Sequence, residues 1–218
     1  MMSRALKKPV FVTFTGVDRA ELIPGMMELS AAYPVEWGIL LDPAQEDNIL
    51  FPAQAERTAL LSAPLRFAAH VCGKPAQAIA NGSRPQVDLR GFARLQLNHS
   101  REGSSETAIA NAHNYCLGHG LRLALQCQGE FPADTRADWL FDVSFGAGTQ
   151  VTQWPVVHRN HPFCGFSGGL SPTTIKEASS RFRAQADYWI DMESGVRTDG
   201  LLDLGKCEQV CKLVYGEA

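Results

Sequence analysis

The sequence predicts an α/β fold of the (β/α)8 barrel type, also known as a TIM barrel, formed by a single domain that spans residues 1–218. Short apolar runs alternate with helical patterns along the chain, which is typical of α/β folds. Most of these runs are continuous, as in parallel strands that are covered on both faces. Divided among eight strand–helix units, 218 residues give about 27 residues each, enough for a strand, a short helix and two loops. A doubly wound open sheet with the same alternation is the alternative.

The chain contains eight candidate strands, each rich in apolar residues. We expect them at residues 10–14, 35–41, 65–71, 92–98, 121–127, 138–144, 163–167 and 187–191. Residues 82–90 are assigned to a loop or a short strand.

Helical patterns separate many of these strands. Helices are expected at AELIPGMMELSAAY, where Pro24 interrupts the pattern, and at FPAQAERTALLSA, PAQAIANG, SSETAIANAHNYCLGHG, PTTIKEASSRF and LLDLGKCEQVCKLVYG. Ser104 or Ser105 is the expected N-cap of the fourth, because a serine hydroxyl can accept a hydrogen bond from an unpaired N–H group of the first turn. Pro172 is expected in the first turn of the fifth, where its fixed φ suits a helix.

Composition and charge limit the classes of partner that we expect this protein to bind. The formal net charge is -3 and no basic run stands out, so neither nucleic acid nor an anionic membrane surface is an expected partner. The apolar run FVTF near the start is too short for a signal peptide or a membrane span, and we expect a cytoplasmic protein. The six cysteines form no CxxC pair, and Cys207 and Cys211 are expected to be small buried residues of the last helix. We expect no metal site and no cofactor.

Two glycine turns follow the last two expected strands. The first contains Gly168, Gly169 and Leu170, and the second contains Ser194, Gly195 and Val196. In a barrel the loops after strands seven and eight lie side by side and frequently bind phosphate. Glycine lets a phosphate approach backbone N–H groups closely, and a helix N-terminus adds unpaired donors. Glycines that only form tight turns are the alternative, but two turns one unit apart favour a phosphate site.

Several segments resemble the phosphoribosylanthranilate isomerase family, barrel enzymes of tryptophan biosynthesis. SGGLSPTTI is similar to the family's GGL-plus-Pro segment after strand seven, and DMESGVRTDG to its D-x-SSGVE segment after strand eight. LFDVSFGAGTQ, LQLN and FTGVD resemble the ends of strands six, four and one, and the likeness is strongest from 138 to 200. The resemblance implies a small phosphorylated ligand and an Amadori rearrangement, which converts a phosphoribosyl amine from its aldose to its ketose form. We expect a monomer or a homodimer.

The resemblance also implies a role for Asp142, at the end of strand six. In this family an aspartate at that position is the acid that protonates the sugar ring oxygen. An apolar setting helps such an acid to keep its proton near neutral pH, and the preceding WLF makes a partly apolar setting expected. Gln96, Asp191 and Gly148 are further candidate substrate contacts.

The family's catalytic base is a cysteine of strand one, where this chain has Thr15. We keep Thr15 as a candidate catalytic residue, although a threonine hydroxyl does not ionise near neutral pH as a thiol can. Asp18, Asp191 or Glu193 could take the base role instead.

Two further positions depart from the family pattern. Leu50 stands where the family has an arginine that pairs with the anthranilate carboxylate, so the anchor for that carboxylate is missing. Glu193 replaces a hydroxyl residue beside the expected phosphate, and its charge would repel the phosphate unless Arg197 offsets it.

Three functions therefore stay open. The first is an aldose–ketose isomerase, an intramolecular oxidoreductase, that acts on a phosphorylated sugar derivative through Asp142. The second is a catalytically inactive or regulatory barrel that only binds a phosphate ligand. The third is a barrel lyase with Asp191 or Glu193 as its base.

Overall fold

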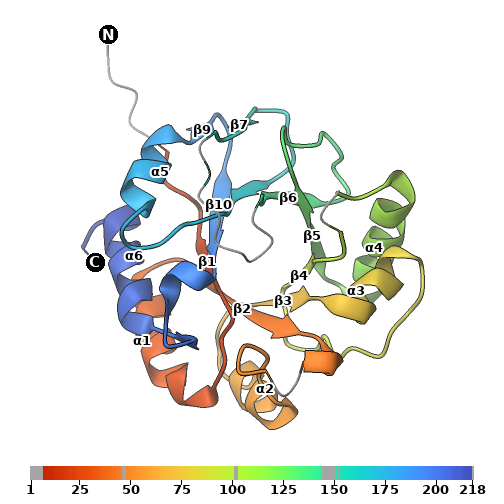
Figure 1. Cartoon of the computed structure of the whole chain (residues 1–218), viewed down its shortest axis with the longest axis horizontal. Coiled ribbons are helices and arrows are strands. Elements are labelled where there is room, and N and C mark those ends of the chain that lie inside the picture. Colours follow the sequence, from red (N-terminus) through yellow and green to blue (C-terminus); the bar gives the residue numbers. More distant parts are fainter. Residues whose placement is uncertain (1–6, 46–47, 101–102, 144–150, 152, 218) are drawn as a thin grey trace.

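A closed barrel of eight parallel strands forms the centre of the protein (Figure 1). The computed structural model describes residues 7–45, 48–100, 103–143, 151 and 153–217. In barrel order the strands are β1 (Val12–Thr15), β10 (Tyr188–Met192), β8 (Cys164–Phe166), β6 (Asp138–Phe141), β5 (Arg122–Cys127), β4 (Arg94–Leu97), β3 (Phe67–Val71) and β2 (Val35–Leu41). β1 closes the barrel by pairing with β2 on one side and β10 on the other. The predicted barrel is confirmed, and the open sheet is wrong.

Six α-helices are present among the described residues, and they cover the outer face of most of the barrel (Figure 1). They are α1 (Ile23–Ala32), α2 (Gln54–Leu61), α3 (Gly73–Ala80), α4 (Glu106–His119), α5 (Ile175–Arg181) and α6 (Leu204–Tyr215). Cys207 and Cys211 are fully buried on the inner side of α6, so their interpretation as small buried residues is confirmed. No helix in the described part of the chain is long and apolar enough to cross a membrane.

Some helix boundaries differ from the prediction. Pro24 does not interrupt a helix but lies in the first turn of α1. N–H groups in the first turn have no partner within the helix, so the lack of one in proline costs no hydrogen bond there. Ser105 is the N-cap of α4, and its hydroxyl accepts a hydrogen bond from the N–H group of Ala108 at 3.2 Å. Pro172 precedes α5 by three positions, because that helix begins only at Ile175.

The arc of the barrel around β6 is covered without regular helices. Residues 128–137 join β5 to β6 with no helix, and the described residues between β6 and β8 contain only the short strand β7 (Val156–Val157), which pairs with β9 (Arg183–Ala184). Phe131 and Trp154 cover this arc instead, and each has its ring against Phe141 and Phe166. The prediction of eight repeated strand–helix units is wrong here, because single aromatic side chains shield the strands.

The lower half of the barrel interior holds a buried ionic network. Arg94 of β4 donates hydrogen bonds to Glu36 of β2 and to Thr13 of β1, and Arg66 pairs with Glu36 at 2.8 Å. The guanidinium carbon of Arg94 also lies 4.5 Å from the ring centroid of Trp189. We call Thr13, Glu36, Arg94 and Trp189 the lower tier. It fills the barrel below the strand ends where the cavity described next begins.

Candidate functional site

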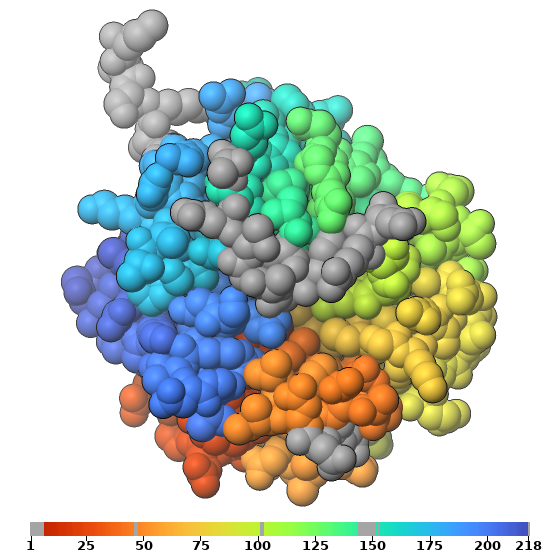
Figure 2. Space-filling view, viewed as in Figure 1, coloured from red at the N-terminus to blue at the C-terminus, as the bar shows by residue number. Residues whose placement is uncertain are grey.

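The carboxyl ends of the barrel strands enclose a cavity of about 460 Å³. Its lining comes from the ends of the barrel strands and from the loops that follow them. Figure 2 shows this face, on which residues near 50, in orange, lie next to residues near 195, in blue. The cavity thus occupies the position at which barrel enzymes hold their substrates.

The two glycine turns meet at the rim of this cavity. Gly168 and Gly169, with φ of 111° and 63°, adopt backbone conformations that favour glycine, and both line the cavity with Leu170 and Ser194. A Cβ atom added to Gly195 would lie 2.0 Å from the carbonyl oxygen of Leu170, so the two turns are in direct contact.

Two of the six residues of the predicted phosphate site, Gly195 and Val196, are absent from the cavity lining. Val196 is fully buried in the core, and its N–H group donates a hydrogen bond to the carbonyl oxygen of Glu193 at 3.2 Å. Gly195 serves the contact between the turns. The cavity wall at this corner is therefore formed by residues 168–170 and by Ser194.

Two buried aspartates from different strands line the cavity. Asp142 directly follows β6, and Oδ2 of its carboxylate accepts a hydrogen bond from Nε2 of Gln126 at 2.9 Å. Asp191 of β10 accepts a hydrogen bond at Oδ1 from the hydroxyl of Thr15 at 2.7 Å. Burial raises the pKa of Asp191 to about 7, against the opposing effects of the Thr15 hydrogen bond and the positive charge of Arg94. One cavity therefore holds two carboxyl groups in different hydrogen-bonding environments.

A known family matches the part of the chain that forms the second half of the barrel. The family model for N-(5'phosphoribosyl)anthranilate (PRA) isomerase matches residues 95–213. The chain belongs to the phosphoribosylanthranilate isomerase family. A search of curated proteins found no match.

Solved structures of this family share the fold. The isomerase from Thermotoga maritima superposes with a TM-score of 0.62 at 14% identity, with 95% of this chain and 99% of that chain covered. The isomerase from Pyrococcus furiosus gives 0.60 at 13%, with 94% and 98% covered. A structure of a phosphoribosylanthranilate isomerase in complex with reduced 1-(o-carboxyphenylamino)-1-deoxyribulose 5-phosphate gives 0.61 at 13%, with 95% and 99% covered. At these identities the likeness shows the fold, so the chain is a divergent family member.

The three candidates for the base role lie in different places. Asp191 and Glu193 line the cavity, and burial raises the pKa of Glu193 while Arg197 opposes that rise. Asp18 lies behind it, where its carboxylate accepts a hydrogen bond from the N–H group of Leu202 at 2.7 Å and pairs with Arg19. Asp18 therefore stabilises the loop after β1 and does not reach the cavity lining.

Arg197 joins the loops that follow the first and last barrel strands. Its Nη2 donates to the carbonyl oxygen of Gly16 at 3.0 Å, and its Nη1 donates to that of Gly200 at 2.8 Å. Although it lies near enough to Glu193 to affect its pKa, Arg197 is absent from the cavity lining. In the family's pattern a glutamate follows SGV, whereas this chain has Arg197 there. The difference adds a positive charge behind the second turn.

The wall near β2 is apolar. Leu50 and Phe51 line the cavity together with Leu40. Leu50, which the sequence resemblance places where the family has an arginine, therefore faces the ligand space without a charge for a carboxylate. Gly148 lies outside the described residues. Among the described residues no group of three or more His, Cys, Asp or Glu side chains could hold a metal ion.

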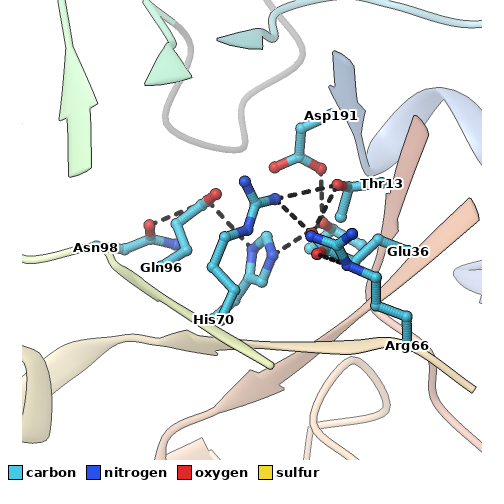
Figure 3. A network of polar contacts seen from close by, with 9 residues as sticks. Thr13, Glu36, Arg66, His70, Gln96, Asn98 and Asp191 are labelled. Carbon is cyan, nitrogen blue, oxygen red and sulfur yellow. Dashed lines mark hydrogen bonds and ion pairs between the residues drawn. The ribbon is translucent and has the colours of Figure 1, made fainter. Parts of the chain in front are cut away.

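His70 is a site residue that sequence reasoning missed. It lies in β3 within the run LRFAAHV, and its ring is fully buried, in contact with Thr15 and with Gln96, which Figure 3 shows beside it. Burial, with a smaller effect of Arg94, lowers the pKa of His70 to about 3, so the imidazole is neutral at physiological pH. The signal that could have revealed it is a lone polar residue at an inward-facing position near the end of an apolar strand.

Proposed function

We propose that this chain binds a phosphorylated sugar derivative in the cavity and interconverts its aldose and ketose forms. Asp142 acts as the general acid and Asp191 as the general base. The observation that carries the proposal is that these two buried carboxyl groups line the same cavity as the two glycine turns. The small phosphorylated ligand named in one of the similar structures supports the same class of substrate.

The phosphate group is held by the backbone of the turns at residues 168–170 and 194. Glycine at 168 and 169 leaves the backbone open to close approach, and the hydroxyl of Ser194 can add a further donor. The charge of Glu193, which lines the same cavity, opposes a dianion, so the attraction must come from these main-chain and hydroxyl donors.

The chemistry needs one carboxyl group that gives a proton and one that takes a proton. Asp142 protonates the ring oxygen, the ring C–O bond breaks with its electron pair on that oxygen, and the lone pair of the amine nitrogen forms a C=N bond at the carbon left behind. Asp191 then removes the proton from the adjacent carbon, the electron pair of the C–H bond forms a C=C bond while the C=N electrons return to nitrogen, and the resulting enol tautomerises to the ketose. A carboxylate with a pKa of about 7 is a stronger base than an ordinary one and is still ionised in a large fraction of molecules at neutral pH. Because the base must be ionised, activity is expected to rise as the pH increases through about 7.

Turnover of sugar phosphates by the purified chain tests the proposal. Phosphoribosylanthranilate is the first substrate to assay, together with rescue of a tryptophan auxotroph that lacks the isomerase. Other phosphoribosyl amines follow, because the apolar Leu50 offers no partner for the anthranilate carboxylate. Thermal stabilisation by inorganic phosphate without turnover of any sugar phosphate would leave a phosphate-binding barrel and overturn the catalytic proposal. Absence of any stabilisation would overturn the phosphate site.

Gly195→Ala tests the contact between the two turns. The added Cβ would lie 2.0 Å from the carbonyl oxygen of Leu170, a separation that real Cβ atoms do not adopt, so the turns must move apart. We expect phosphate to bind about tenfold more weakly, which corresponds to about 1.4 kcal/mol. Calorimetric titration with ribose 5-phosphate measures the change. Gly118→Ala is the matched control, because a Cβ there meets nothing within 4 Å. Equal affinities of the two variants would contradict the role of the turns.

A further inference from the structure

A chain of polar contacts between residues that line the cavity runs from strand to strand (Figure 3). Gln96 of β4 contacts His70 of β3, with 3.2 Å between Nε2 of the amide and Nδ1 of the ring. Nε2 of the same ring lies 3.5 Å from the hydroxyl oxygen of Thr15 on β1. That hydroxyl in turn donates to Oδ1 of Asp191 on β10. Four strands thus contribute one residue each to a path that ends on the proposed base.

The contacts define a direction for the chain. The hydroxyl of Thr15 has a single hydrogen, which it donates to Asp191. Its oxygen can therefore only accept a hydrogen bond from His70. A neutral imidazole carries one N–H group, and placing it on Nε2 satisfies this contact. Nδ1 is then an acceptor for the amide N–H of Gln96. Every donor in the chain therefore points toward Asp191.

Gly38 provides an independent observation, because it makes the space for this chain. β2 lies between β1 and β3, and Gly38 pairs in register with Thr15 on one side and with Ala68 on the other. A Cβ at Gly38 would lie 2.7 Å from the Thr15 hydroxyl oxygen and 3.0 Å from Nε2 of His70. The hydroxyl and the imidazole meet across β2 only because this residue has no side chain.

We propose that Thr15 and His70 are positioning residues, which hold Oδ1 of Asp191 so that Oδ2 faces the substrate carbon. The inference rests on the proposed function, because it assigns Asp191 the role of the base. It gives Thr15 a task that a threonine hydroxyl can perform without ionising. Within the described part of the chain no hydrogen bond to Oδ2 of Asp191 is present, so this oxygen is available for a proton.

The surroundings of Asp191 determine how its ionisation responds. Arg94 of β4 favours the charged form, whereas Glu193 after β10 and Asp142 after β6 disfavour it. His70 is neutral and does not titrate in the neutral range. The Thr15 hydrogen bond lowers the pKa of Asp191, so its loss must raise that pKa further.

The test compares Thr15→Val, which removes the hydroxyl at nearly constant volume, with Thr15→Ser, which keeps it. We expect Thr15→Val to lower kcat by about 10²-fold, since the base is no longer held in place. KM should change little, and the acidic limb of the pH–rate profile should move to higher pH. In Thr15→Ser, both kcat and the position of the acidic limb should be close to those of the wild type. Gly38→Ala should reproduce the effects of Thr15→Val although every polar group of the chain is retained.

A second measurement separates this inference from the proposed function. Carbon-13 NMR titration of the Asp191 carboxyl in the ligand-free protein needs no turnover, with circular dichroism to verify that each variant is folded. A pKa of Asp191 that rises in Thr15→Val and Gly38→Ala, and returns in Thr15→Ser, supports the positioning chain even if no substrate is turned over. In that case only the proposed function fails. An unchanged titration of Asp191 in Thr15→Val would overturn the inference, whatever the catalytic activity.

Discussion

Asp191→Asn is expected to lower kcat by about 10²- to 10⁴-fold and to abolish the acidic limb of the pH–rate profile, because the proton acceptor is lost. The amide oxygen of asparagine can still accept the Thr15 hydrogen bond, so the barrel should stay folded. Asp142→Asn is expected to reduce kcat by a similar factor through loss of the proton donor. Steady-state kinetics between pH 5 and 9, on whichever sugar phosphate the wild type turns over, measures both effects.

Asp187→Asn is the control for these two variants. It changes a carboxylate of the same region of the chain to an amide, but Asp187 lies on the exposed side of the barrel, where it pairs with Lys7. Its kinetics should match those of the wild type. If Asp191→Asn retained the wild-type kcat, the base assignment would be wrong, and Glu193 would become the candidate. If only Asp142→Asn retained it, the acid assignment would fail.

Glu36→Gln is expected to reduce the free energy of unfolding by about 3–5 kcal/mol. The carboxylate is fully buried and holds Arg94, whose guanidinium is equally buried in the lower tier. Without it Arg94 keeps no carboxylate at ion-pair distance among the described residues, and two of its nitrogens, Nε and Nη1, already lack a hydrogen-bond partner there. Urea denaturation monitored by tryptophan fluorescence measures the change.

The control for this prediction is Glu177→Gln, which breaks the exposed pair with Arg181 on α5. Pairs of this kind contribute little to stability, so the unfolding midpoint should hardly move. Replacing Glu36 and Arg94 together by apolar residues should recover much of the loss, because no unpaired charge is then left in the barrel. Equal losses in the single and double variants would show that the ion pair itself is not the cause.

Most of the fold could be predicted because its signals are local. Each barrel strand is a short apolar run, and the predicted range 35–41 coincides with β2. The covering of the arc near β6 was missed, since nothing in the residues around Phe131 shows that one ring replaces a helix. Such substitutions of one kind of packing for another depend on neighbours that are distant in sequence.

The candidate site could be predicted only in part for a similar reason. Asp142 and Asp191 were found because both stand near the ends of predicted strands, in short segments that resemble motifs of the family. The contact between Thr15 and His70 was not found, because it depends on the register that places Gly38 between them. Arg94 was also missed. It is a charged residue within an apolar strand, and only the closed barrel brings it next to its partner, Glu36.

The lower tier has a consequence for how readily this protein can acquire new specificities. Its ion pairs and the ring of Trp189 secure the barrel without any residue of the cavity wall. We therefore expect exchanges at positions such as Leu50 to alter ligand preference at small cost to folding. Because stability and ligand contacts depend on different residues, we expect the protein to be a suitable scaffold for directed evolution. Libraries of variants at the cavity rim could be screened without first adding stabilising substitutions.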